Sequence, residues 1–577
     1  MTAYIERFPE EAKLVRSALY TSFIALAIGA FFGLLQVLHR TDVLRIIDST
    51  DYYSILTLHG VLLVISFTIF FLVGIFTWAT TTSLDRPLED HRFSWLWFGL
   101  MVLGMVLAAI PMFGGLTDAV DLSAAVLFTF YAPLQAHWLF YLGLAIFIVG
   151  TWLAGVDWIR SYLAWRKVNP DERIPLPMFM VLTTYGFWYL ASIGVAISVL
   201  FFLLPWSLGI FDQVNALLTR TLFWYFGHAV VYFWLMPTYM MWYLLLPKIS
   251  GGKLFSDPLA RVVFILFLLL STPTGIHHQY LDPGIAEGFK FIVMTNTMFL
   301  LLPSLLTAFT VVASMEHGAR QRGGTGYFGW LTALPWRDPV FTGMALSGLM
   351  FAAAGFSGIV NAGMTINYMV HNTFWIVGHF HLTVGTAVAL TFMAVSYWFI
   401  PQLTGKPLWR RGIALTQVVT WFVGMTFMAN AMHRGGLASI PRRTAEPQYT
   451  YFDFEPALGS VAELDMQVVI GGTLLFISVV LFITVILGTI TQDIDLPSIP
   501  ANTYADALSG PDDSPKVLDN LKLWVGIAIL LVIIAYTLPL AAIIERGGLF
   551  GPGGGAFPQF IDLIGHTAWT TLLETLR

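Results

Sequence analysis

The chain has 577 residues, of which 57% are apolar and 11% are charged, and its mean hydropathy is +0.75. Soluble domains carry about 25% charged residues, so the composition excludes an ordinary soluble protein and predicts one integral to a membrane. The net charge of −5 argues against a nucleic-acid partner, and a chain without cysteine cannot form disulfides, iron–sulfur clusters or thiolate copper sites.

Apolar runs long enough to cross a bilayer, which takes about 20 residues, recur along the whole sequence. About thirteen stretches qualify, and the loops are mostly short. We therefore expect an all-α integral membrane protein, with one transmembrane domain over residues 1–546 and an external C-terminal tail over 547–577. The expected spans lie near 17–39, 53–80, 93–113, 131–155, 179–205, 221–247, 259–281, 290–315, 341–361, 368–400, 413–432, 467–492 and 523–545.

The distribution of lysine and arginine predicts the orientation of the chain. Most of the 29 basic residues fall at the N-terminus and in the even-numbered connections. Basic loops stay on the cytoplasmic side, so we expect a cytoplasmic N-terminus. The loop between the spans expected near 413–432 and 467–492 is an exception, because it faces outward and still carries Arg442 and Arg443.

Six histidines fall within the expected spans, in the outer third of the bilayer. Polar side chains are costly inside a membrane and are by default candidates for function. Any single one is most simply a packed, hydrogen-bonded histidine, but six from four helices at one depth indicate a metal or haem cluster. They are His59, His228, His277, His278, His379 and His381.

The spacing of these histidines separates them into groups. His379 and His381 are two residues apart and so point to opposite sides of a helix, where they can hold two different metals. His277 and His278 follow a proline and a glycine that can loosen the helix, which would let both rings reach one ion. With His228 they would form a three-imidazole site suited to copper, or to zinc on chemistry alone.

Hydroxyl groups lie below His228 on the same helix. Tyr232 follows His228 by one turn, and Tyr239 and Tyr243 continue on that face toward the cytoplasm. We expect a proton path along this face, although the alternative is that the hydroxyls only bond to backbone or join helices. The next span would add Ser304, Thr307 and Thr310 to the column.

Four motifs carry a resemblance to a known family. "TLHGVLL", "GHAVVYFW", "GIHHQYLDPG" and "VGHFHL" occur in this order and on the expected helices. In these motifs the chain resembles subunit I of the haem–copper terminal oxidases, over at least the second to eleventh spans. The resemblance implies a respiratory oxidoreductase that reduces O₂ to water, with proton pumping.

The resemblance assigns roles to the histidines one by one. His59 and His381 would be the axial ligands of a low-spin haem, which we expect to be b-type. His379 would be the single ligand of a high-spin haem, which we expect to be a-type. His228, with the adjacent pair His277–His278, would bind one copper ion facing that haem.

The resemblance also implies a role for Tyr232 and for the outward-facing arginines. The phenol would be joined covalently to His228 and would supply the fourth electron and a proton for O–O cleavage. The anionic haem propionates would point outward, so that basic and polar groups at the outer surface would pair with them. We expect these partners to be Arg442, Arg443, His371 and Asn372.

Two departures from the family pattern bear on the branch. Many relatives carry a glutamate where this chain has Val230, and no carboxylate lies deep in any expected span. With the tyrosine column, this indicates the B-type branch, which uses one proton channel. Ala229 replaces a proline that most relatives have.

The expected partners follow from the missing cysteines. A second subunit with a dinuclear copper centre would pass electrons from cytochrome c or a small copper protein. The resemblance implies a multi-pass protein of a prokaryotic plasma membrane, in contact with lipid. The alternative functions are a nitric oxide reductase with a related binuclear site and a transporter with a histidine proton relay.

Overall fold

The computed structural model describes residues 3–117, 121–445, 459–497 and 503–551. Within them, thirteen helices are long and apolar enough to cross a membrane, which confirms the expected all-α membrane bundle. Most of the expected tail, residues 552–577, lies outside the described residues. The spans are α2 (Pro9–Arg40), α3–η1–α4 (Ser49–Val61, Leu62–Phe67, Thr68–Leu84), α5 (His91–Gly114), α6 (Trp138–Val168), α7–η2–α8 (Leu176–Ile197, Ser198–Leu203, Leu204–Ser207), α9 (Ala216–Ile249), α10–η3 (Asp257–Ser271, Thr272–Gln279), α11–α12 (Glu287–Phe299, Leu301–Gln321), α13 (Pro339–Ala362), α15–η5–α16 (Phe374–Leu382, Thr383–Val388, Ala389–Thr404), α17 (Arg411–Leu437), α18 (Val461–Thr491) and α19 (Leu521–Gly547).

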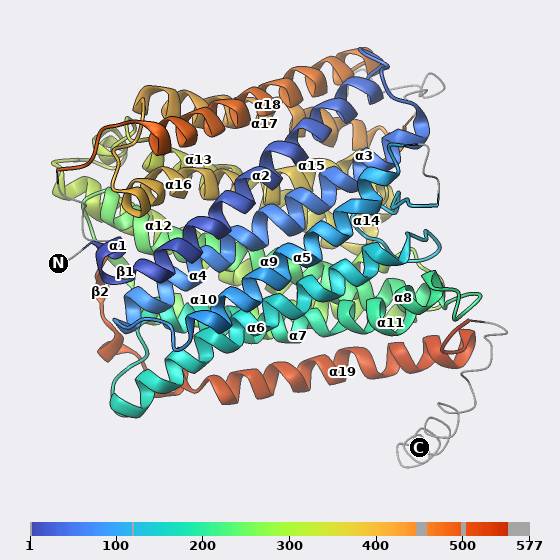
Figure 1. Ribbon diagram of the computed structural model, residues 1–577, viewed down its shortest axis with the longest axis horizontal. Coiled ribbons are helices and arrows are strands. Elements are labelled where there is room, and N and C mark those ends of the chain that lie inside the picture. Colours follow the sequence, from blue (N-terminus) through green and yellow to red (C-terminus); the bar gives the residue numbers. More distant parts are fainter. Residues whose placement is uncertain (1–2, 118–120, 446–458, 498–502, 552–577) are drawn as a thin grey trace.

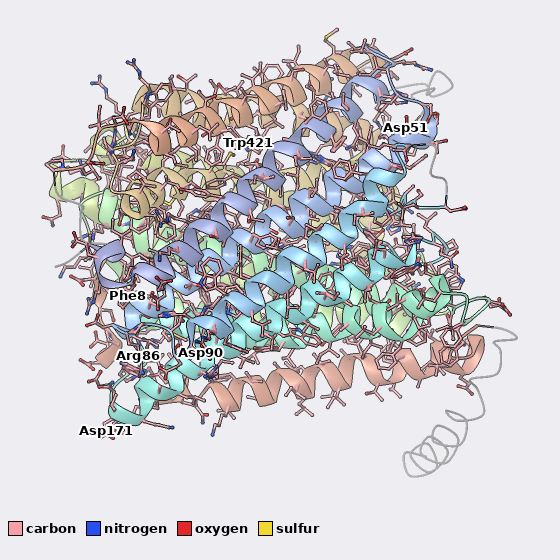
Figure 2. The ribbon with its side chains drawn as sticks, in the orientation of Figure 1. Phe8, Asp51, Arg86, Asp90, Asp171 and Trp421 are labelled. Atoms are coloured by element: carbon pink, nitrogen blue, oxygen red, sulfur yellow. The ribbon has the colours of Figure 1, made fainter. Side chains whose placement is uncertain are left out.

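The spans lie side by side in one bundle, with α18 along one edge and α19 along the opposite edge (Figure 1). Charged side chains gather at the two ends: Arg86, Asp90 and Asp171 lie at one end, and Asp51 lies at the other (Figure 2). This distribution leaves the long apolar middle of the bundle to face lipid, as expected for a membrane-spanning protein.

Burial separates inner spans from outer ones. In the most apolar 18-residue windows, the buried share is 94% for α3–η1–α4 and 89% for both α9 and α15–η5–α16, against 22% for α19. The three innermost spans are those in which the sequence places His59, His228 and the pair His379–His381. The metal-binding candidates are therefore in the centre of the bundle.

Regular α-helix is interrupted beside each group of candidate ligands. The π-helical turn η1 begins three residues after His59, and the π-helical turn η5 begins two residues after His381. His277 and His278 lie in the 3₁₀ segment η3, where Pro273 departs from helical φ and ψ, as its proline and glycine predict. Such irregular turns are frequent at functional sites because they redirect side chains.

Short elements connect the spans at the ends of the bundle. Strand β1 pairs in parallel with strand β2, which brings the α18–α19 connection against the end of α9. The buried Arg261 of α10 bonds Asp257 and Asp519, and Asp519 also bonds Arg173, so the same connection is held by ion pairs. The short elements are α1 (Tyr4–Arg7), β1 (Leu254–Ser256), η4 (Gly329–Ala333), α14 (Met364–Val370), β2 (Ala507–Ser509), η7 (Pro511–Asp513) and η8 (Lys516–Asp519).

Candidate haem and copper site

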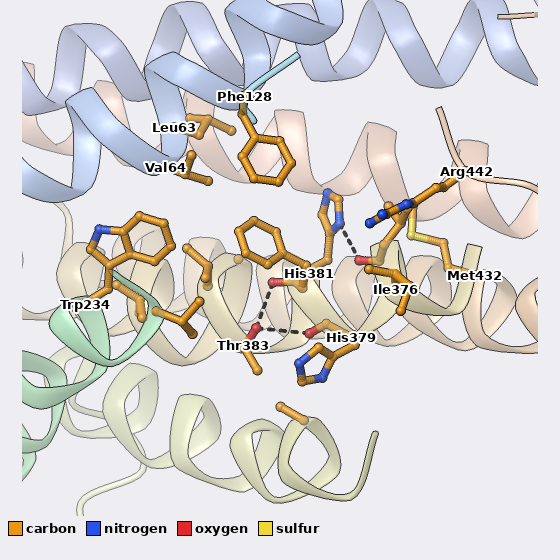
Figure 3. Close-up of a pocket in the computed structure, with 18 of the residues that line it drawn as sticks. Leu63, Val64, Phe128, Trp234, Ile376, His379, His381, Thr383, Met432 and Arg442 are labelled. Carbon is orange, nitrogen blue, oxygen red and sulfur yellow. Dashed lines mark hydrogen bonds between the residues drawn. The ribbon is translucent and has the colours of Figure 1, made fainter. Parts of the chain in front are cut away.

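One continuous cavity in the centre of the bundle is bordered by all six candidate histidines. Tyr232 and the outer pair Arg442–Arg443 also border it. Figure 3 shows His379 and His381 leaving α15 in opposite directions, as their two-residue spacing predicts. The side chains that the sequence singled out therefore meet in one place, although they come from helices far apart in the chain.

His59 and His381 face each other across one part of this cavity. Their ring centroids are 6.3 Å apart and their planes differ by 18°. The Nδ1–H of His59 donates to the carbonyl of Gly29 over 2.9 Å, and that of His381 donates to the carbonyl of Val377 over 2.8 Å. Each Nε2 is left to bind a metal, and two metal–nitrogen bonds of about 2 Å each between the rings match their separation.

A close approach at α2 fixes the position of His59. A Cβ atom on Gly33 would lie 2.8 Å from Cε1 of His59, so only glycine leaves room for the ring. Gly33 also borders the cavity beside that ring. The helix α2 therefore both receives the hydrogen bond of His59 and sets how close its ring lies.

His379 points to the other side of α15. Its Nδ1–H donates to the hydroxyl of Ser357 over 2.9 Å, and that hydroxyl donates in turn to the carbonyl of Ala354. This chain of bonds fixes the tautomer and leaves Nε2 directed at the cavity as a ligand. No second histidine faces His379 at the distance that separates His59 from His381 among the described ring pairs.

His228, His277 and His278 offer three ligand nitrogens that lie within 4.8 Å of one another. Nδ1 of His228 is 3.2 Å from Nε2 of His278, and Nδ1 of His277 donates to the hydroxyl of Thr297 over 2.8 Å. The ring of Trp224 stacks on His278 at 4.0 Å, which holds the third imidazole in place. The arrangement fits a soft divalent or monovalent metal such as copper.

Tyr232 lies one turn below this triad. Its ring centroid is 4.9 Å from that of His228, with an interplanar angle of 63°. Nε2 of His228 is buried and has no hydrogen-bond partner among the described residues. That nitrogen is thus available on the side of the imidazole away from the other two ligands.

The outer end of the cavity is basic and polar. The guanidinium of Arg442 donates to Oδ1 of Asn372 over 2.7 Å, and Arg443 carries a buried Nη2 without a partner among the described residues. His371 bonds Oδ1 of Asn367, and burial, with the charges of Arg442 and Arg220, lowers the pKa of His371 to about 4. Its ring is therefore neutral at pH 7, and the positive charge here belongs to the arginines.

The hydroxyl column predicted from the sequence is present on α9 and α12. Tyr239 Oη lies 3.2 Å from Ser304 Oγ, and Tyr243 Oη lies 2.6 Å from Thr307 Oγ1. Thr310 is fully buried one turn further along and donates to a backbone carbonyl. These hydroxyls bond to each other and also to the backbone. The arrangement is therefore compatible both with a proton path and with hydroxyls that only join helices.

One buried carboxyl lies just beyond an expected span. The span expected near 131–155 continues as α6 to Val168, so that Asp157 lies inside a helix and is completely buried. Its Oδ2 accepts from the hydroxyl of Ser94 over 2.5 Å and from the indole of Trp97 over 3.0 Å. The sequence did not indicate this carboxyl, because the apolar run of the expected span ends two residues before it.

Several residues that shape the site carry no signal in the sequence. Thr297, Ser357 and Trp224 each hold a histidine, yet each lies in an ordinary apolar helix. Ser314 is different, because it is fully buried one turn after Thr310 and could have been added to the hydroxyl column from its spacing alone.

The fold and the site together define a membrane-embedded protein of the haem–copper class. Residues 13–474 match the family described as Cytochrome C and Quinol oxidase polypeptide I. The chain belongs to this family, and it is the catalytic subunit I of a haem–copper terminal oxidase, an oxidoreductase that binds haem and copper. The expected multi-pass membrane placement is confirmed with it.

Known proteins are similar over nearly the whole chain. Cytochrome c oxidase subunit 1 of Thermus thermophilus is 41% identical over 548 residues, covering 92% of this chain and 94% of the relative. Quinol oxidase subunit 1 of Sulfolobus acidocaldarius is 26% identical, covering 60% and 64%. A cryo-EM structure of a heme-copper terminal oxidase dimer matches with a TM-score of 0.87 and 37% identity, covering 94% of each chain.

Proposed function

We propose that this chain reduces O₂ to water in a B-type terminal oxidase, with electrons from outside and protons from the cytoplasm, coupled to proton pumping. The observation that carries the proposal is the placement of Tyr232 one turn from His228, on the cavity that His379 also borders. That cavity brings a metal triad, a single facing imidazole and a phenol to one reaction space.

The two haem positions divide the work between them. His59 and His381 would together hold one haem, which would only pass electrons. His379 alone would hold the other, on the cavity that the triad of His228, His277 and His278 also borders. When bound, the high-spin haem and the copper would supply O₂ binding and three of the four electrons needed to cleave O–O.

Tyr232 would supply the remaining electron together with its phenolic proton. The overall reaction takes up four electrons and four protons for each O₂ and releases two waters. We propose that a ring carbon of Tyr232 is covalently joined to Nε2 of His228, which has no other partner among the described residues. The bond would replace the Nε2–H and one ring C–H, and O₂, the oxidant of the proposed reaction, would take up the two electrons and two protons released. The link would keep the phenol at the site through each turnover.

Protons would return to Tyr232 through the hydroxyl column. Tyr239, Tyr243 and Thr307 are each within hydrogen-bond distance of another column member. A run of hydroxyls with intervening water can pass protons through an otherwise apolar bundle. The proposed column comprises Tyr232, Tyr239, Tyr243, Ser304, Thr307 and Thr310.

The basic outer end of the cavity would hold the haem propionates. Arg442 and Arg443 supply charge, and the buried Nη2 of Arg443 has room for an anionic partner. His371 and Asn372 would add neutral hydrogen bonds, since the His371 ring is uncharged at pH 7. The charge excess in this outward loop then has a chemical reason.

The choice of branch rests on the wall of the cavity. Val230 is buried at the position where many relatives have a glutamate, and it borders the cavity. The wall carries no aspartate or glutamate among the residues that the structure describes. A nitric oxide reductase, which uses carboxylate help at a non-haem iron, is therefore the less supported alternative.

The complete enzyme requires parts outside this chain. We propose a second subunit with a dinuclear copper centre, which receives electrons from cytochrome c or a small copper protein. We further propose a cytoplasmic N-terminus, one transmembrane domain over residues 1–546, a b-type low-spin haem and an a-type high-spin haem. The setting would be a prokaryotic plasma membrane.

Pyridine-haem spectroscopy with metal analysis of the purified complex tests the proposal. We expect two haems and one copper for each copy of this chain, beyond the copper of the second subunit. An active preparation without this copper and with extra non-haem iron would instead establish the reductase. A chain without haem bands would remove both and leave the transporter reading.

A further inference from the structure

Helix α19 lies at the edge of the bundle and follows the residues that match the family, which end at 474. Most of its surface is exposed: Ile533, Ile534 and Leu538 are each more than half exposed. Tyr536 is the opposite, since only 4% of it is accessible. A tyrosine buried at the edge of a membrane bundle needs a reason.

The ring of Tyr536 packs edge-on against Tyr225 of α9, with centroids 4.9 Å apart and planes at 88°. Tyr225 is itself fixed, because its hydroxyl donates to the carbonyl of Leu190 over 2.7 Å. Tyr536 is thus held against an element that cannot easily shift. Its hydroxyl is buried beyond that contact, toward the η3 segment.

The hydroxyl of Tyr536 lies against Gly275. A Cβ added to Gly275 would lie 2.6 Å from the Tyr536 Oη and 2.3 Å from the carbonyl oxygen of Trp224. Tyr536 of α19 and the backbone of α9 therefore meet Gly275 on the side where a side chain would begin. Only glycine leaves room for both.

Gly275 is two residues before the first histidine of the candidate copper triad. A 3₁₀ segment has poor hydrogen-bond geometry and is rarely stable over eight residues, so η3 depends on the elements around it. Trp224 contacts this segment twice, with its carbonyl at Gly275 and with its ring on His278. A shift of Gly275 would therefore also disturb Trp224, on whose ring His278 stacks.

We propose that Tyr536 is a positioning residue for the copper site, which packs on Gly275 beside the carbonyl of Trp224 and so fixes His277 and His278 relative to His228. The inference rests on the proposed copper site. Helix α19 would thus support the copper site without contacting the metal. The competing explanation is that Tyr536 only helps α19 to pack.

The test compares two truncations on the same buried face of α19. Ile543 is 2% exposed and belongs to the same apolar cluster as Tyr536. It lies two turns further along α19, and the atoms nearest the Gly275 Cβ position belong to Trp224 and Tyr536. In the purified oxidase complex, Tyr536→Ala and Ile543→Ala would both loosen the packing of α19. Only Tyr536→Ala removes the contact with Gly275.

Two readouts separate the explanations without reference to turnover. We expect Tyr536→Ala to lose copper to a chelator about 10-fold faster than wild type, the lower bound for a lost supporting contact. With carbon monoxide as the probe, its infrared stretching band on the copper should shift or broaden. Ile543→Ala should keep the wild-type copper content and band.

Tyr536→Phe keeps the ring and provides a second variant if the alanine variant does not fold. Its carbon monoxide band should shift in the same direction by a smaller amount, since only the hydroxyl over Gly275 is lost. If both Tyr536 variants match Ile543→Ala in the carbon monoxide band and in the rate of copper loss, Tyr536 does not position the copper site. A wild-type complex without copper at this site would instead overturn the proposed function beneath it.

Discussion

At the scale of single residues, the three candidate haem ligands are each oriented by a hydrogen bond from the second nitrogen of the imidazole. Nδ1 of His59 and of His381 is bonded to a backbone carbonyl, and Nδ1 of His379 to a hydroxyl. A carbonyl can only accept, so these bonds dictate which nitrogen carries the proton. The ligand nitrogens are therefore prepared for metal before any metal binds.

Tyr232→Phe removes one oxygen atom and leaves the ring in place. Turnover should fall by about 10²- to 10⁴-fold, the range for losing a positioned proton donor, since both the fourth electron and its proton are lost. Oxygen consumption measures the rate. Mass analysis of the peptides should show His228 and the new phenylalanine unlinked.

Tyr189→Phe is the matched control for that substitution. Its hydroxyl donates to the carbonyl of Trp152 on the far side of α7 and does not border the cavity. It should retain wild-type turnover. Equal activity in the Tyr232 and Tyr189 variants would remove the phenol from the mechanism.

Gly33→Val tests the position of His59. The added side chain would overlap the ring, since even a Cβ comes within 2.8 Å of it. We expect loss of the low-spin haem absorption band with the high-spin band retained. Gly99→Ala on α5, where a Cβ meets nothing within 4 Å, should leave both bands unchanged.

At the scale of elements, irregular turns do what regular helices could not. The turns η1, η3 and η5 each adjoin or contain candidate ligands. The extra residue in a π-turn rotates the part of the helix that follows it. The side that carries the ligands and the packing side of the following half can therefore point in different directions. The two spans with π-turns, α3–η1–α4 and α15–η5–α16, thus aim their histidines inward while their lower halves pack independently.

The sequence predicted some of these elements and missed others for physical reasons. The spans and the grouping of histidines follow from local spacing, so they could be predicted. The bonds of His277 to Thr297 and of His379 to Ser357 join separate helices, and no local pattern encodes them. The π-turns share no proline or glycine signal, since η5 contains Gly385 and η1 contains neither residue. Asp157 lies where α6 continues beyond its most apolar stretch.

The hydroxyl column belongs to two helices and fails if either contributes too few groups. Tyr243→Phe breaks the 2.6 Å contact with Thr307. Proton uptake in a single turnover should slow by about 10²-fold, since a positioned proton relay is lost. Reduction of the low-spin haem, which needs no proton from this path, should keep its rate.

Thr295→Val on α11 is the control for the column. Its hydroxyl donates to the carbonyl of Phe291 on an exposed face, away from the column. Proton uptake in this variant should match wild type. If Tyr243→Phe also takes up protons at the wild-type rate, the cytoplasmic protons travel by a different route.

At the scale of the whole molecule, ion pairs hold the connection that leads into α19. The preceding connection is held by Asp519, which bonds Arg261 over 2.7 Å and Arg173 over 2.6 Å. Arg261 is completely buried, so it depends on its acidic partners for compensation. The ion pairs and the β1–β2 pairing together fix where the last helix starts.

Asp519→Asn should therefore destabilise the protein. We expect up to about 3 kcal/mol, the lower bound for breaking a buried pair, because Asp257 still faces Arg261. Thermal unfolding of the purified complex measures the loss. Asp512→Asn, at an exposed position in the same connection, should unfold at the wild-type temperature.

The cavity wall also has a consequence for how the protein is made. Its lining begins at Leu26 in α2 and ends at Val479 in α18, so it draws on nearly four-fifths of the chain from first to last. A ribosome must therefore release nearly all of the spans before the enclosure exists. Delivery of the cofactors must be one of the last events of biogenesis, and a chain cut short before α18 would leave them without a closed compartment.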